Sequence, residues 1–254
     1  MTPVIETEGL GMRYGRRVAL TDCTLRVPAG KVAGFVGPNG AGKSTFLGMV
    51  AGLLAPTSGR IAVLGHRPGG GAARLADVAF VAQDAPLYPY MTVADHLRFG
   101  ARLNPRWDGP YARARIDRLG LDPAQKAGRL SGGQRAQLAL TLAAAKRARL
   151  LVLDEPVASL DPLARRTFLE DLQETVAEVE VSVMLSSHLL GDLQRVCDHL
   201  IVLSAGRVQL AGDVPALLAG HSRSDGERIV PRPDGRPVDL EDLVLAYMAG
   251  EVVR

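Results

Sequence analysis

The stretch 37–44, Gly-Pro-Asn-Gly-Ala-Gly-Lys-Ser, fits the pattern G-x-x-x-x-G-K-[ST] in full. It follows the apolar run 31–36 and opens the segment 43–54, in which apolar residues recur at helical spacing. In this pattern the glycines bring backbone N–H groups to phosphate oxygens, and the helix start adds its positive dipole end. We therefore expect a phosphate-binding loop in which Lys43 faces the phosphates and Ser44 offers a hydroxyl to Mg²⁺.

Two acids close the apolar run at 150–155, Leu-Leu-Val-Leu-Asp-Glu. Ligands of an open α/β sheet bind at the carboxyl ends of its strands. We expect Asp154 to hold Mg²⁺ through its water shell and Glu155 to accept a proton from the water that attacks the γ-phosphate. The alternative is a strand-end turn without a chemical role, and the presence of the phosphate loop makes it the weaker interpretation.

Short β-rich runs alternate with helical ones along the chain, which predicts an α/β core. The strand-like runs lie at 18–27, 31–36, 60–64, 77–82, 149–154, 181–186 and 199–204. The central runs are continuously apolar, as parallel strands covered on both faces are. Residues 86–130 contain two helical stretches, 92–103 and 111–120, and no strand signal, so we expect an inserted helical lobe. The polar segment 221–238 predicts a loop or linker, and 239–249 predicts a short helix with an Asp cap.

The segment Leu130-Ser131-Gly132-Gly133-Gln134-Arg135 precedes Asp154 and resembles the signature of the ATP-binding cassette (ABC) ATPases. Ser131 and the two glycines start a helix, expected at 133–147, and would expose N–H groups to an anion. The resemblance covers nearly the whole chain. It implies a P-loop NTPase core with a mostly parallel sheet, an antiparallel β part at the N-terminus and a helical lobe at about 86–145. The domain would span 1–220, followed by a linker and a short helix in 221–254.

The resemblance also assigns roles to single residues. Tyr14 stands where an aromatic ring stacks on adenine, Gln83 where a glutamine senses Mg²⁺ and water, and His188 where a histidine contacts the γ-phosphate. The segment 159–161 resembles the loop that joins two active sites. The implied catalytic residues are Glu155, His188, Gln83 and Lys43, and the implied metal ligands are Ser44, Gln83 and Asp154. The implied ATP-binding residues are Tyr14, Gly37, Pro38, Asn39, Gly40, Ala41, Gly42, Lys43, Ser44, Thr45, Ser131, Gly132, Gly133 and Gln134.

The function implied by the resemblance is ATP hydrolysis, with Mg²⁺, in the ATP-binding subunit of a membrane transporter. A separate membrane permease and a second cassette, most simply an identical one, would be the partners, because Ser131–Gln134 would cap the ATP held by the opposite subunit. One cassette without a fused membrane domain, the stretch 104–108 and the segment 240–248 look like bacterial exporter cassettes for drugs, antibiotics or polysaccharides. The alternatives are an ABC ATPase without a membrane partner, as in iron–sulfur cluster assembly, and a nucleotide sensor that does not hydrolyse ATP.

Composition excludes several other classes of protein. The net charge is only +3, and no Lys/Arg run stands out, so we expect no nucleic-acid partner. Two cysteines far apart exclude a disulfide framework. The first residues lack the pattern of a signal peptide, and no window is apolar enough to span a membrane. The expectation is a cytoplasmic protein, peripheral on the inner face of the cell membrane.

The segment 84–92, Asp-Ala-Pro-Leu-Tyr-Pro-Tyr-Met-Thr, follows Gln83 and leads into the predicted lobe. Its apolar side chains lie in a stretch expected at the surface. One interpretation is a groove that receives a cytoplasmic helix of the membrane subunit. The other is that these side chains pack the lobe onto the core. The same choice holds for Trp107, which is either an exporter feature or simple packing of the lobe.

Overall fold

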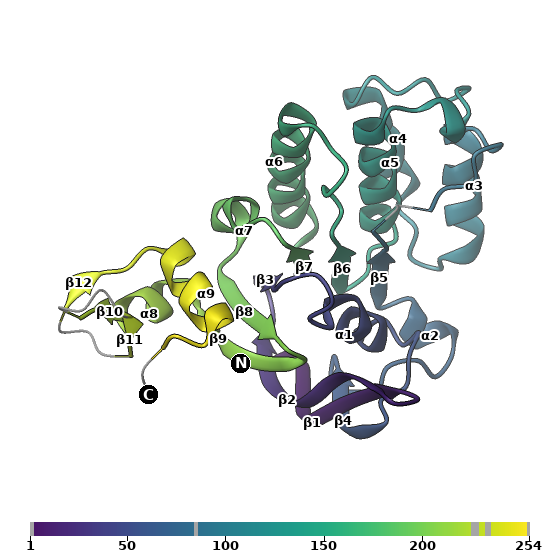
Figure 1. Cartoon of the computed structure of the whole chain (residues 1–254). Coiled ribbons are helices and arrows are strands. Elements are labelled where there is room, and N and C mark those ends of the chain that lie inside the picture. The colour runs from purple at the N-terminus through teal and green to yellow at the C-terminus, as the bar shows by residue number, and fades with distance from the viewer. Residues whose placement is uncertain (1–2, 84–85, 225–228, 232–234, 253–254) are drawn as a thin grey trace. The chain divides into compact units, whose positions relative to one another are not determined.

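The computed structural model describes residues 3–83, 86–224, 229–231 and 235–252. The chain divides into two compact units, the first formed by residues 1–68 and 184–254 and the second by residues 69–183. Strands and helices alternate in both units, which confirms the predicted α/β class (Figure 1).

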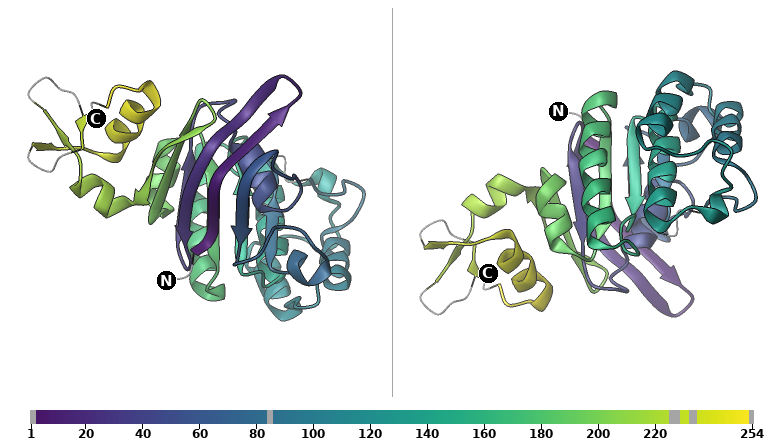
Figure 2. Two further views of the ribbon diagram at one scale, coloured as in Figure 1. Left: turned by 90° about the horizontal axis from the view of Figure 1, so that it is seen from below. Right: turned by 90° about the horizontal axis from the view of Figure 1, so that it is seen from above.

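The first unit begins with an antiparallel sheet in the order β2-β1-β4. Its strands are β1 (Pro3–Tyr14), β2 (Arg17–Pro28) and β4 (Ser58–Val63). Figure 2 shows β1 and β2 as a long purple hairpin, in which Tyr14 pairs with Arg17 beside the turn. The alternation at 18–27 thus marks a half-buried strand, and the antiparallel N-terminal part of the predicted fold is confirmed.

The phosphate-loop strand lies in a second sheet of the first unit, with the order β7-β3-β8-β9. Every residue of β3 is buried, and β3 pairs in parallel with β8, whereas β9 returns antiparallel to β8. The strands are β3 (Val32–Val36), β7 (Ser182–Ser187, of which Met184 onward belongs to this unit), β8 (His199–Ser204) and β9 (Arg207–Asp213). Because parallel strands end at one edge, the loops after β3 and β8 lie close together.

The helix after the phosphate loop is shorter than predicted. Helix α1 spans Lys43–Val50, and the chain then turns at Gly52, whose φ of 75° lies in the left-handed region. The N–H groups of Leu53 and Leu54 both donate to the Gly48 carbonyl oxygen, at 2.8 and 3.1 Å. The apolar spacing over 43–54 therefore continues through a turn, because the glycine closes the helix.

The C-terminal part of the first unit differs from the predicted linker. Within 221–238 the described residues form a small sheet in the order β11-β10-β12, while 225–228 and 232–234 lie outside the described residues. His221 is buried, and its ring nitrogens lie 2.7 Å from the Leu217 carbonyl oxygen and 2.8 Å from the Tyr247 hydroxyl. The composition of this segment suggested a loop, whereas these contacts and a buried Ile229 give it structure. The elements are α7 (Leu190–Val196), α8 (Val214–Ala219), β10 (Ser222–Arg223), β11 (Ile229–Val230), β12 (Arg236–Pro237) and α9 (Leu240–Ala249).

The second unit joins two parallel strands to a group of helices. Its strands β5 and β6 pair from Val78 opposite Leu150 to Val81 opposite Leu153, and the Ser182 N–H donates to the Arg149 carbonyl oxygen. The elements are α2 (Ala72–Leu75), β5 (Val78–Val81), α3 (Val93–Leu103), α4 (Gly109–Arg118), the 3₁₀ turn η1 (Ala127–Arg129), α5 (Gly132–Ala145), β6 (Leu150–Asp154) and α6 (Pro162–Val179).

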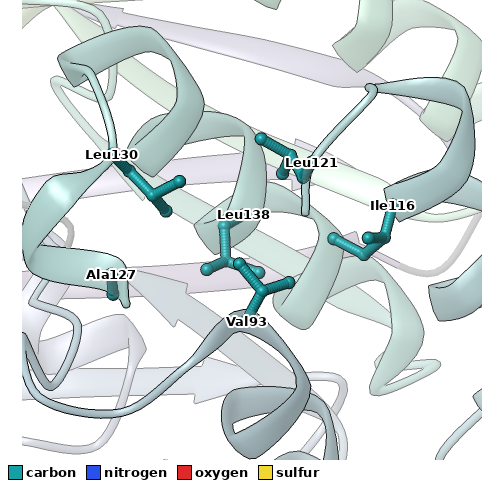
Figure 3. Packing of buried hydrophobic residues seen from close by; sticks show 6 residues of the cluster. All are labelled: Val93, Ile116, Leu121, Ala127, Leu130 and Leu138. Carbon is teal, nitrogen blue, oxygen red and sulfur yellow. The ribbon is translucent and has the colours of Figure 1, made fainter. Parts of the chain in front are cut away.

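A buried cluster holds the helical lobe together. It joins side chains of α3, α4, η1 and α5 with those of the connecting segments (Figure 3). Its members are Val93, Ile116, Leu121, Ala127, Leu130 and Leu138. Leu130 is only 4% exposed and immediately precedes Ser131, so the cluster fixes the place where α5 begins.

Candidate functional site

The glycines of the phosphate loop are required by their surroundings in the first unit. A Cβ atom added at Gly37 would lie 2.2 Å from the Leu203 carbonyl oxygen, on the neighbouring strand β8. One added at Gly42 would lie 2.7 Å from the Ala19 carbonyl oxygen, and Gly42 has a φ of 106°. Gly40 has open space, but its φ of 80° favours glycine as well. The loop thus keeps its shape only without side chains at these positions.

Lys43 is directed back over the loop. Its side chain is buried, and Nζ donates to the carbonyl oxygens of Gly37 at 2.7 Å and Pro38 at 3.4 Å. Ser44 is exposed, and Thr45 is half-buried. The remaining loop residues are the exposed Pro38 and Asn39 and the buried Ala41. The loop thus brings a lysine ammonium and a serine hydroxyl to the start of α1.

Tyr14 reaches the same region through the β1–β2 hairpin. The loop residue Gly42 packs on Ala19 of β2, and Arg17 lies two residues, about 7 Å, farther along that strand. Tyr14 is the cross-strand partner of Arg17, and the residue is 46% exposed. The hairpin therefore offers an open aromatic face within reach of a ligand on the loop.

His188 follows β7 on a tight turn and is exposed. The Ser187 hydroxyl holds this turn, because its oxygen accepts from the Leu189 N–H at 3.0 Å. The same hydroxyl lies 3.1 Å from the Leu189 carbonyl oxygen and 3.5 Å from the Asp192 carboxylate. Since β7 neighbours β3 in the sheet, the phosphate loop and His188 follow adjacent strands.

The second unit brings Gln83, Asp154 and Glu155 to one edge. Strands β5 and β6 are parallel and in register up to Val81 opposite Leu153, so the residues that follow both strands leave the sheet at the same end. Gln83 is exposed, whereas Asp154 and Glu155 are only 4% and 7% exposed. Glu155 has a φ of 45°, a left-handed conformation that is unfavourable for a residue with a Cβ atom.

The start of α5 carries a capping box. The Ser131 hydroxyl accepts from the Gln134 N–H at 3.2 Å, and the Gln134 side-chain oxygen accepts from the Ser131 N–H at 3.0 Å. Of the N–H groups at this helix start, those of Ser131 and Gln134 are therefore occupied. Gly132 and Gly133 are the first two helical residues, whose N–H groups have no carbonyl partner within the helix. An anion at this point would meet chiefly the two glycines.

The start of α6 lies against the start of α5. Asp161 caps α6, and its carboxylate accepts from the N–H groups of Leu163 and Ala164 at 3.0 Å. Leu160 is buried, and a Cβ at Gly132 would lie 3.5 Å from its Cδ2 atom. The segment 159–161 thus supports the predicted anion-binding start of α5 within the same unit.

The predicted site residues fall into two sets. The first unit holds the phosphate loop, Tyr14 and His188, and the second holds Gln83, the start of α5 and the two acids at the end of β6. Among the described residues, no group of three or more His, Cys, Asp and Glu side chains gathers as a metal site would. The sequence analysis missed Ala164, because its importance comes from contact with another helix and not from a motif.

Packing within the lobe accounts for some of the apolar residues that the sequence analysis singled out there. Leu87 packs on the buried cluster of the lobe, and a Cβ at Gly100 would lie 2.6 Å from the Trp107 ring. The packing interpretation therefore holds for Leu87 and Trp107. Tyr88 is 58% exposed, and its ring lies edge-on to that of Phe99. Residues 84 and 85 of the proposed groove lie outside the described residues.

Comparison with known proteins identifies the family of this chain. The family model described as ABC transporter matches residues 20–158, more than half of the chain. The chain belongs to the ABC transporter family. The matched range of this ABC chain includes the phosphate loop, the signature segment at the start of α5 and the acids that end β6.

Curated relatives of the ABC chain include both importers and an exporter. It is 35% identical over 229 residues to the sulfate/thiosulfate import ATP-binding protein CysA of Burkholderia mallei, which covers 87% of this chain. The chain spans 65% of the length of that relative. It is 32% identical to the Nod factor export ATP-binding protein I of a Rhizobium species, over 96% of this chain and 81% of the relative.

Solved structures support the ABC ATPase fold. The structure of an ATP-binding subunit of an ABC transporter superposes with a TM-score of 0.80 at 28% identity, covering 96% of this chain and 99% of the other. CbiO1 from Clostridium perfringens, part of the ABC transporter complex cbiONQ, gives a TM-score of 0.72 at 26% identity, covering 84% and 89%. None of the helices in the described part of this ABC chain combines the length and the apolar character needed to cross a bilayer.

Proposed function

We propose that this chain binds and hydrolyses ATP as the ATP-binding subunit of an ABC transporter. The observation that carries the proposal is the phosphate loop between β3 and α1, whose glycines are required by close backbone neighbours and by φ. Backbone N–H groups of such a loop and the start of α1 attract phosphate. The phosphates would replace the loop carbonyls as acceptors for Lys43, and Tyr14 would stack on the adenine.

The proposed Mg²⁺ ligands are Ser44, Gln83 and Asp154. A hydroxyl, an amide oxygen and one carboxylate are hard oxygen donors, and Mg²⁺ takes one or two carboxylates while it keeps several waters. These residue types therefore fit the ion. When bound, Mg²⁺ would neutralise charge on the β- and γ-phosphates.

Glu155 is the proposed general base and would accept a proton from the attacking water. Its burial and its position after β6 suit a carboxylate that must face one water and exclude others. His188, exposed on the turn that Ser187 holds, would contact the γ-phosphate, and Gln83 would orient the water.

One proposed partner is a second cassette, most simply a copy of this chain. The start of α5 would cap the ATP on the opposite subunit through the N–H groups of Gly132 and Gly133, with Ser131 and Gln134 holding the helix start. Two subunits would then share two ATP sites. The support is that α5 offers a second anion-binding start, separate in sequence from the phosphate loop.

A membrane permease is the proposed transport partner, and the chain would lie at the inner face of the cell membrane. The exposed Tyr88 and Tyr90, which follow Gln83 in the sequence, and the exposed Phe99 on α3 would supply an aromatic surface for that permease. We further propose export as the direction, with a drug, antibiotic or similar compound as the substrate. The similarity to the Nod factor export relative over most of both chains favours this direction.

The decisive experiment mixes two inactive variants of the full chain. In Lys43→Ala the phosphate loop fails, and in Ser131→Arg the capping start of α5 fails, so each homodimer has two defective sites. A mixed dimer has one site with both defects and one with neither. ATP hydrolysis or ATP-driven dimerisation that returns on mixing supports shared sites. If the mixture stays inactive although mixed dimers form, the shared-site proposal fails.

A second experiment with the full chain distinguishes a transporter subunit from an ABC ATPase without a membrane partner. Tagged chain is expressed with a candidate permease, and detergent extracts are tested for co-purification and for ATP hydrolysis that rises with the permease. Stimulation by the permease supports the transporter function. If the chain does not co-purify with the permease and hydrolyses ATP equally well without it, the result favours an ABC ATPase without a membrane partner.

A further inference from the structure

Arg115 is a buried cation inside the helical lobe. It lies on α4, is only 2% exposed, and donates from Nε to the Thr141 hydroxyl at 3.2 Å. Its Nη2 atom donates to the Gln137 side-chain oxygen at 3.3 Å. Both of these acceptors are neutral groups on α5. Burial of a cation is costly unless charge and hydrogen bonds compensate it, so its place here needs a further explanation.

Gln137 connects this cation to a carboxylate on another helix. While its oxygen accepts from Arg115, its Nε2 atom donates to a carboxylate oxygen of Asp171 on α6. The orientation of the amide is set by these two partners, because only the nitrogen can donate and only the oxygen can accept. A guanidinium, an amide and a carboxylate thus form one line across α4, α5 and α6.

This line lies close to the two helix starts described above. Gln137 stands one turn after Gln134 of the capping box on α5. The starts of α5 and α6 meet at Gly133, where an added Cβ would lie 3.1 Å from the Ala164 Cβ. The two helices are therefore fixed against each other at their starts by contact and farther along by hydrogen bonds.

We propose that Arg115, Gln137 and Asp171 are positioning residues, which set the register of α5 on α6 and so the aim of the N–H groups of Gly132 and Gly133. Packed helices have several near-equal settings of ridges in grooves, and apolar contact alone selects among them weakly. Hydrogen bonds that join three helices in one line form in only one setting and are lost when one member is missing. The inference deepens the proposed function, because it rests on the start of α5 acting on the partner subunit's ATP.

A neighbouring pair of contacts offers a matched control. Arg118, one turn after Arg115 on α4, contacts Glu174 at 3.2 Å and Glu178 at 3.4 Å, both on α6. All three side chains are more than 40% exposed, and ion pairs in solvent contribute little to structure. Arg118→Gln therefore also removes a cation that links α4 to α6, but outside the buried line.

The test exchanges the amide and the carboxylate. Gln137→Glu places two carboxylates against each other, so we expect kcat for ATP to fall about 10- to 100-fold, as small misplacements near a reacting group do. ATP affinity of the single chain should stay within twofold. Adding Asp171→Asn supplies an amide that donates to the new carboxylate at position 137, which still accepts from Arg115, and kcat should return to within about threefold of wild type. Arg118→Gln should keep the wild-type kcat.

Each result bears on the inference. Wild-type kcat in Gln137→Glu, or a doubly exchanged variant that is folded but still slow, overturns it. If Gln137→Glu alone does not fold, the double exchange is compared with Arg115→Met, and equal kcat values for these two also overturn it. Recovery in the double exchange supports it. A wild-type chain that neither binds nor hydrolyses ATP would instead refute the proposed function, so the two failures are distinguishable.

Discussion

Gly133 in the first turn of α5 lies directly against Ala164 in the first turn of α6, and a Cβ added to Gly133 would come within 3.1 Å of the Ala164 Cβ. Such a distance is tighter than ordinary contact, so one helix start would have to shift. Gly133 has no positive φ, so close approach and not backbone conformation requires the glycine here.

Gly133→Ala should therefore lower ATP hydrolysis while leaving ATP binding by the single chain intact. The reason is that the phosphate loop is unchanged, whereas the start of α5 is displaced by a few tenths of an ångström. We expect a fall of about tenfold in kcat, measured at saturating Mg-ATP. Adding Ala164→Gly opens the space again and should restore the rate. A rate that stays low in the double variant would mean that the methyl group acts on the ligand and not on α6.

Lys43→Ala should weaken ATP binding much more than adenosine binding. The substitution removes the ammonium that faces the loop, while Tyr14 keeps its exposed ring for the base. Tyr14→Ala should show a different pattern, with both ligands weakened equally by roughly 1 kcal/mol, because both lose the stacking contact with the base. Titration of both variants with ATP and adenosine checks the pair. Equal losses for both ligands in Lys43→Ala would indicate an unfolded loop.

Glu155→Gln should bind Mg-ATP and hydrolyse it about 10²- to 10⁴-fold more slowly, because the amide cannot accept the proton of the attacking water. The variant should accumulate as an ATP-bound dimer, which gel filtration with ATP detects. Its thermal stability should match wild type, since the side chain keeps its shape and the backbone keeps its φ. Near-normal turnover would assign the base to another residue.

The backbone at this position offers a control for that variant. A φ of 45° costs a residue with a Cβ roughly 1 kcal/mol or more, and glycine is free of this cost. Glu155→Gly should therefore be as slow as Glu155→Gln without a loss of melting temperature. A large drop in melting temperature would show that the buried carboxylate, and not the backbone, determines stability here.

The outcome of the sequence analysis depended on the kind of signal at each position. The phosphate loop, β6 and the start of α5 carry local patterns whose chemistry needs fixed spacing, and these elements lie where they were predicted. The end of α1 was predicted four residues too late, because the apolar spacing continues past Gly52. The small sheet within 221–238 escaped prediction because its stability comes from contacts such as that of His221 with Tyr247, distant in sequence.

The site itself was predictable only as a set of motifs. Sequence spacing could point to Lys43, Asp154 and Ser131, since each stands in a known pattern. It could not reveal that the Ser131 N–H is already bonded to Gln134, nor that Arg115 reaches Asp171 through Gln137. Such contacts join separate helices or depend on side-chain rotamers, so no local pattern records them.

The stability that Asp95 contributes to the capping box of α3 should depend on pH. The backbone N–H and the hydroxyl of Thr92, followed by Arg98, lower the pKa of the Asp95 carboxyl from 3.8 to about 2. A lowered folded-state pKa stabilises the fold above the unfolded value, and this contribution is lost as the pH falls toward 2. Asp95→Asn should therefore melt below wild type at pH 7, and the difference should shrink as the pH falls from about 4 toward 2. A difference that stays constant from pH 7 to pH 2 would contradict the assignment.

The aromatic surface beside the lobe should affect the permease without affecting the fold. Tyr90 is 86% exposed and Tyr88 is 58% exposed, so replacing either with alanine should leave the melting temperature and ATP binding near wild type. Leu87 packs on the buried cluster of the lobe, and Leu87→Asp should cost about 3 kcal/mol of stability. If the surface receives the permease, Tyr88→Ala and Tyr90→Ala lose co-purification with it and the ATP hydrolysis that it stimulates. Stable variants that still couple normally would place the permease contact elsewhere on the chain.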